Sequence, residues 1–101
     1  MIVYRVAVTV HPPEIEAVRA MFTRLVTASR AVPGVVSFDI TQDLTNPARF
    51  ISIEVYQNQA AVDRQGLLPE LTEVMAALGH LAAGPPAGRK FVISRSEPWP
   101  L

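Results

Sequence analysis

Three side chains able to do chemistry, Arg5, Glu54 and Tyr56, fall within strand-like segments of this 101-residue chain. Alternate residues of a strand share a face, which places Glu54 and Tyr56 together. A guanidinium can stabilise an anion, a carboxylate can act as a general base, and a tyrosine hydroxyl can hydrogen-bond a substrate oxygen. We therefore predict Arg5, Glu54 and Tyr56 as the catalytic residues.

Each of the three also has a plain structural interpretation. Arg5 and Glu54 lie on strands that we expect to be neighbours, and they could simply form an ion pair. Tyr56 could be a packed aromatic side chain at a strand end, because a phenol with an ordinary pKa of about 10 is a poor base. Both interpretations stay open at the level of sequence.

Four further residues are predicted to contact a substrate: Phe50, Asp39, Gln65 and Trp99. Asp39 could instead face solvent from its strand, and Gln65 could be an amide on a helix surface. Trp99 stands between two prolines, where it could cover the pocket of a partner or dock the tail of its own chain. A tryptophan suits either role because it carries a large apolar body with one polar group.

Other kinds of chemistry find no support in the residues. His11 and His80 have no metal-ligating neighbour at a suitable spacing, and the chain has no cysteine, so no metal site is expected. Glycine-rich phosphate loops, nucleophile elbows and the HExxH and CxxC motifs are all missing. We predict a protein that works without a cofactor.

Charge and hydropathy restrict the partners and the location. Nine basic and nine acidic residues cancel and form no runs, which argues against nucleic acid and anionic membranes. The apolar start MIVYRVAVTV is too short to span a bilayer, contains Arg5 and lacks a cleavage site, so we interpret it as a strand. With no cysteine, the cytoplasm is the default location.

Hydrophobic periodicity and turn residues predict seven elements in the order β, α, β, β, α (broken into two helices), β. They are a strand from Ile2 to Val10, a helix from Pro12 to about Val32, strands over 35–41 and 50–56, helices over 58–65 and 69–83, and a strand over 89–95. This order predicts a ferredoxin-like α+β fold, a four-stranded antiparallel sheet with helices on one face. We expect a single domain over 1–101, with an extended tail over 96–101.

The predicted strands have one nearly pure aliphatic face, which we assign to the side under the helices. Its members are Val6, Val8, Phe38, Ile40, Ile51, Ile53, Val55, Phe91 and Ile93. The other face then mixes apolar side chains with polar ones: Val3, Ala7, Val35, Phe50 and Val92 with Arg5, Asp39, Glu54 and Tyr56. Such a face is too apolar to be left in water, so we predict a homodimer in which two sheets close on each other around a ligand cavity.

The stretch VPGVVSFDITQDLTNPARFISIEVYQNQAAVD, from Val32 to Asp63, resembles the central signature of the antibiotic-biosynthesis monooxygenase (ABM) domains. The resemblance implies a dimeric α+β barrel with one pocket per subunit. It also implies cofactor-free oxidation, by O2, of a small phenolic, quinol or polyketide-like aromatic. The alternative is a non-catalytic dimeric module of the same fold that binds a ligand or has a structural role.

Haem degradation, the activity of one branch of that family, is disfavoured. That branch uses an asparagine on the first strand, a tryptophan ending the third strand and a histidine in the following helix. The matching positions of this chain hold Arg5, Tyr56 and Gln65.

Overall fold

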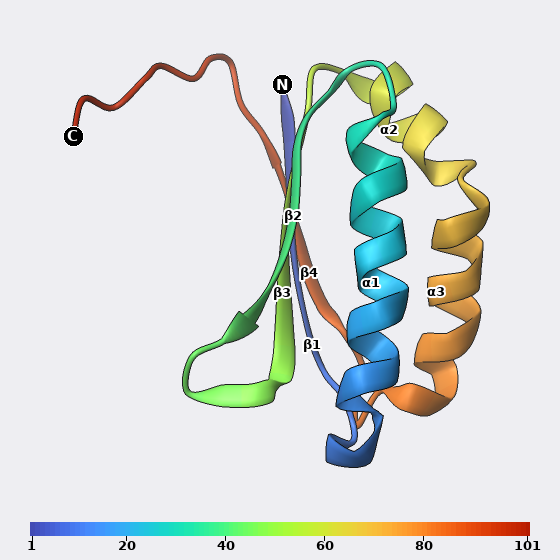
Figure 1. Cartoon of the computed structure of the whole chain (residues 1–101). Coiled ribbons are helices and arrows are strands. Elements are labelled where there is room, and N and C mark those ends of the chain that lie inside the picture. Colours follow the sequence, from blue (N-terminus) through green and yellow to red (C-terminus); the bar gives the residue numbers. More distant parts are fainter.

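The computed structural model describes residues 1–101 and has a four-stranded antiparallel sheet with its helices on one face (Figure 1). Its elements are β1 (Ile2–Thr9), a 3-10 turn (Pro12–Glu14), α1 (Ile15–Arg30), β2 (Val35–Asp43), β3 (Asn46–Tyr56), α2 (Gln59–Gly66), α3 (Pro69–Leu81) and β4 (Ala87–Val92). The strand order is β2-β3-β1-β4. The predicted ferredoxin-like fold class is therefore confirmed.

Two local signals set the turn from α1 into the sheet and the start of α2. Gly34 has a φ of 88°, and a Cβ there would lie 2.6 Å from the Cβ of Ala61, so only glycine fits. Asn58 caps α2, because its side-chain oxygen accepts a hydrogen bond from the backbone N–H of Ala61 at 3.0 Å. The backbone at Gly34, just before β2, therefore lies close against the first turn of α2.

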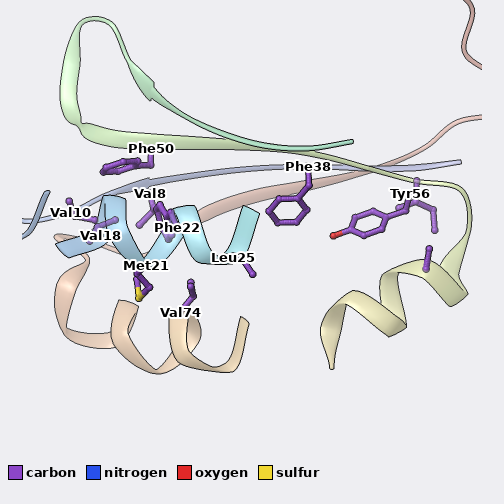
Figure 2. Packing of buried hydrophobic residues seen from close by; sticks show 12 residues of the cluster. Val8, Val10, Val18, Met21, Phe22, Leu25, Phe38, Phe50, Tyr56 and Val74 are labelled. Carbon is purple, nitrogen blue, oxygen red and sulfur yellow. The ribbon is translucent and has the colours of Figure 1, made fainter. Parts of the chain in front are cut away.

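The core lies between the sheet and the apolar stripe of α1. Val18, Phe22 and Leu25 of that stripe are buried, and the ring of Phe22 meets the ring of Phe50 edge to face at 5.3 Å. Val74 of α3 belongs to the same cluster, as Figure 2 shows. α3 packs mainly on α1 rather than on the strands, and this leaves room between α3 and the sheet.

The predicted orientation of β3 is wrong. Phe50 and Tyr56 are buried on the helix side, together with Ser52 and Glu54, whereas Ile51, Ile53 and Val55 lie on the open face of the sheet. Register explains the result, since cross-strand partners share a face and β1 pairs Val6 with Ser52 and Tyr4 with Glu54. Alternation separates two sets of side chains but does not say which set is covered.

The predicted faces of β4 and of the start of β2 are also wrong. Phe91 pairs with Val3 on the open face, and Val92 pairs with Ile2, so the two β4 side chains are interchanged. In β2, Val35 pairs with Tyr56 whereas Ser37 pairs with Val55. An extra residue, Val36, therefore bulges out and is exposed, which moves Val35 to the helix side.

None of the three helices is both long enough and apolar enough to cross a membrane. The longest, α1, has 16 residues and carries exposed arginines along one side.

Candidate active site

A cavity of about 210 Å³ lies between the sheet and the helices α1 and α3. Most of its wall is aliphatic or aromatic. The lining side chains are Val6, Val8, Phe22, Leu25, Phe38, Ile40, Phe50, Ser52, Glu54, Gln65, Leu71, Val74, Met75, Leu78 and Pro86. The pocket is partly open to solvent, but its mostly apolar wall reduces the screening of a charge held against it.

Three of the lining side chains are polar, and two of them sit side by side on β3. Ser52 donates a hydrogen bond from its hydroxyl to one oxygen of Glu54 at 2.8 Å. Tyr56 donates to the other oxygen, also at 2.8 Å. Each carboxylate oxygen therefore has one hydroxyl donor, an arrangement that suits the ionised, acceptor-only form of Glu54.

Tyr56 lies behind Glu54 and is held as a neutral phenol. Burial, the nearby Glu54 carboxylate and the hydrogen bond between them raise the pKa of Tyr56 far above its ordinary value of about 10. The ring of Tyr4 packs edge to face against Tyr56 at 5.9 Å, and Figure 2 shows the Tyr56 oxygen pointing along the sheet toward Phe38. Tyr56 is thus a hydrogen-bond donor in this site and not a base.

Gln65 supplies the third polar group of the wall from the last turn of α2. Its side-chain nitrogen donates a hydrogen bond to the hydroxyl of Ser29 on α1 at 3.3 Å, and both residues are buried. This bond fixes the amide plane against α1. The interpretation of Gln65 as a surface amide is therefore wrong, since the side chain faces the cavity.

The predicted grouping of Arg5 with Glu54 and Tyr56 is wrong. Arg5 pairs with Ile53 and Arg89 across the open face, on the opposite side of the sheet from Glu54. The suggested ion pair between Arg5 and Glu54 is also wrong, because two hydroxyls occupy the Glu54 oxygens instead. The cause is the misassigned face of β3.

Of the four residues predicted to contact a substrate, two line the cavity and two lie elsewhere. Phe50 and Gln65 line the cavity. Asp39 lies exposed on the open face, where Arg30 donates to its carboxylate at 2.8 Å. Trp99 is 81% exposed in the tail and is not among the residues that line the cavity.

Sequence reasoning missed Ser29 and Ser52. Ser52 alternates with Glu54 on β3, so a correct assignment of that strand would have found it. Ser29 gives no comparable signal, because a serine near a helix end is ordinary and only the packing of α2 on α1 shows its role. No group of three or more His, Cys, Asp or Glu side chains is arranged to hold a metal ion.

The sheet order and the helices on one face define a ferredoxin-like α+β protein, and a mostly apolar cavity that contains a carboxylate lies between its two layers. The sequence profile of the family described as "Antibiotic biosynthesis monooxygenase" matches residues 1–77, and the chain belongs to that family. No curated protein matches the sequence.

Solved structures of similar fold cover almost the whole chain. One, a crystal structure of an antibiotic biosynthesis monooxygenase, has 19% identity and a TM-score of 0.85, and the match covers 94% of this chain and 100% of that one. Rv0793 from Mycobacterium tuberculosis has 21% identity and a TM-score of 0.85, over 94% and 96%. PA3566 from Pseudomonas aeruginosa has 21% identity and a TM-score of 0.83, and the match covers 93% of this chain and 94% of that one. At these identities the likeness concerns the fold alone.

Proposed function

We propose that this protein is a cofactor-independent monooxygenase that oxidises a small phenolic, quinol or polyketide-like aromatic with O2 in the cavity between sheet and helices. One observation carries the proposal: a carboxylate, Glu54, faces a mostly apolar cavity and accepts hydrogen bonds from two hydroxyls. The monooxygenase name of the family and of one structural neighbour supports it.

The cavity indicates the size of the substrate. Its volume of about 210 Å³ is below the roughly 300–1,000 Å³ of pockets for drug-sized ligands. The aromatic rings of Phe22, Phe38 and Phe50 would pack against a flat ring system, and because Phe22 and Phe50 are nearly perpendicular, one of these two would present its edge. A substrate of one to three fused rings with an acidic O–H or C–H group fits both the volume and the wall.

The chemistry begins with proton removal. Glu54 takes the proton from an enolic O–H, or from a methylene carbon beside a ring carbonyl, and leaves an electron-rich anion. That anion gives one electron to O2, the two radicals combine into a C–O bond, and the peroxide then loses water as the second C–H proton leaves. In sum the methylene group and O2 become a carbonyl group and one water molecule, and the substrate supplies all four electrons.

The remaining polar groups act on the anion and on the base. The Gln65 amide presents an N–H that can hydrogen-bond the developing oxyanion, and its bond to Ser29 limits its movement. Ser52 and Tyr56 keep Glu54 pointed into the cavity. The mostly apolar wall limits the access of water, which would otherwise protonate the substrate anion before it reacts with O2.

We also propose that the chain acts as one domain, 1–101, in a homodimer formed through the open face of the sheet. Along the middle of this face, β3 and β1 present mostly apolar side chains: Val3, Ala7, Ile51, Ile53 and Val55. One row across the face runs Asp39, Ile53, Arg5, Arg89, acidic at the β2 edge and basic at the β4 edge.

That row suggests how the two sheets meet. A two-fold axis parallel to the strands lays β2 of one copy over β4 of the other, which brings Asp39 over the second copy's Arg89. Asp39, whose carboxylate already accepts a hydrogen bond from Arg30 of its own chain, then lies over the second copy's Arg89 at both ends of the row, and the apolar strip is buried between these ends. Sedimentation at micromolar concentration tests this proposal, and the mass of a single chain would refute it.

The test of the activity is oxygen uptake by the purified protein, without flavin, metal or haem, against a panel of phenols, hydroquinones and anthrones. We expect uptake that Glu54→Gln abolishes. Arg5→Ala is the matched control, because Arg5 lies on the other face of the sheet and its loss should leave turnover intact. Absence of uptake with every member of the panel, in a protein that still binds them, would favour the non-catalytic module.

A further inference from the structure

The last eight residues, 94–101, are not attached to the rest of the chain. The final backbone contacts with the body are two hydrogen bonds between Met1 and Ile93, at 3.0 and 3.2 Å. Beyond them no hydrogen bond joins residues 94–101 to any element, and the ion pair of Arg95 with Glu97 is internal to the segment. We call residues 94–101 the C-terminal arm.

The arm is apolar where it is most exposed. Trp99 is 81% exposed and Leu101 fully so. Pro98 and Pro100 on either side of Trp99 restrict the backbone to extended conformations, so the arm loses little entropy when it docks. A preorganised segment with an exposed tryptophan has the features of an interface anchor, since tryptophan is among the residues that dominate binding energy.

The direction of the arm indicates the side on which it docks. In Figure 1 the helices cover one side of the sheet, and the arm leaves on the other, beyond the open face. It starts at the end of the sheet where Val35, Tyr56, Ile2 and Val92 form one row across the strands. The exposed bulge at Val36 lies at this same end, on the far edge.

The total surface is too large for a compact chain of this size. A compact 11.0 kDa monomer exposes about 5,600 Å², and this chain exposes 6457 Å². Its radius of gyration, 13.9 Å, also exceeds the value of about 12.7 Å for a compact domain of this length. The excess surface is close to the roughly 800 Å² that each partner buries in a typical specific interface.

We propose that the C-terminal arm of each copy docks on the second copy of this chain, with Trp99 as its anchor, at the start of β2 beside the exposed Val36. This inference rests on the proposed dimer. The two-fold axis parallel to the strands lays β4 of one copy over β2 of the other and keeps their ends level. The arm, which continues β4, therefore reaches the second copy's Val36 and not its own.

Trp99 is the only tryptophan of the chain, so its fluorescence reports on the arm directly. We expect Trp99 to be shielded from iodide quenching in the dimer and to become accessible on dilution, in step with dissociation followed by sedimentation. Val36→Asp should expose Trp99 at concentrations where the parent protein shields it. Leu67→Asp is the control, because Leu67 is also apolar and exposed, at 83% against 54% for Val36, but follows α2 on the helix side.

Removal of residues 95–101 should weaken dimerisation by about tenfold or more, the loss expected when an interface tryptophan goes. If iodide quenches Trp99 in the dimer as strongly as in the protein unfolded by urea, the proposed docking of the arm is refuted while the proposed dimer stands. Shielding that persists in the diluted monomer would also overturn it, since the arm would then dock on its own chain. Shielding unchanged by Val36→Asp would refute the docking place, and a chain that never dimerises would refute the dimer itself.

Discussion

The hydroxyl of Tyr56 donates a 2.8 Å hydrogen bond to the carboxylate of Glu54, its neighbour two positions earlier on the same face of β3. The contact works in both directions. The carboxylate raises the pKa of the phenol, and the phenol, which stays protonated, holds the carboxylate in place. The proposed base therefore points into the cavity because of a residue that does not itself line the cavity.

Replacement of Tyr56 by phenylalanine tests this positioning role. We expect kcat for oxygen uptake to fall by about tenfold, because Glu54 keeps only the Ser52 donor and loses its fixed direction. KM should change little, since Tyr56 does not touch the cavity. Steady-state kinetics at a fixed pH measure both constants. An unchanged kcat would show that Ser52 alone positions the carboxylate.

The stability of the protein should fall in alkaline solution. Tyr56 has a pKa near 10 in the unfolded chain and a higher one in the folded protein, so above about pH 10 the unfolded state releases a proton that the folded state keeps. The stabilisation is complete below pH 10 and is lost as the pH rises toward the folded pKa. Urea unfolding from pH 8 to 11 measures the decline, and Tyr56→Phe should flatten it. Equal slopes for both proteins would assign the decline to other groups.

Gly34→Ala should destabilise the fold by about 2 kcal/mol or more, since the new side chain meets a positive φ and the Cβ of Ala61 at 2.6 Å. Gly66→Ala is the control, because a Cβ there has open space around it and φ is not positive. The urea midpoint should fall below that of the parent for Gly34→Ala and rise slightly above it for Gly66→Ala. Similar midpoints would mean that the turn between α1 and β2 can move aside.

A charge in the middle of the open face should prevent the dimer. Val55 is half-buried on the apolar strip and pairs with Val3, so in the dimer it lies over the second copy's Val3, and Val55→Asp would bury a carboxylate that has no charged partner. We expect a monomer by sedimentation, with the melting curve otherwise intact. Met75→Asp, on the helix side, should stay dimeric. A dimeric Val55→Asp protein would place the interface elsewhere.

The sequence carried the element order, the hairpin of β2 with β3 and the cap at Asn58, because these depend on local spacing and turn chemistry. It did not carry the orientation of β3. Ile51, Ile53 and Val55 are more apolar than Ser52 and Glu54, so hydrophobicity favoured the wrong face. The face covered by the helices contains the polar side chains of the cavity, and the open face is apolar because, as we propose, it forms the dimer interface. Hydrophobicity identifies the covered face only when the other face is polar.

The alternation of β3 has one more consequence. Its odd-numbered residues from 51 to 55 lie on the open face of the sheet, and its even-numbered residues from 50 to 56 lie on the helix side, so each position of this stretch is constrained either by the proposed interface or by the core and the cavity. Substitutions are therefore constrained in both sets. A single inserted residue would also move every side chain that follows it in the strand to the opposite face. We expect the length of this strand to be the most strictly inherited feature among descendants of this protein, ahead of any single side chain on it.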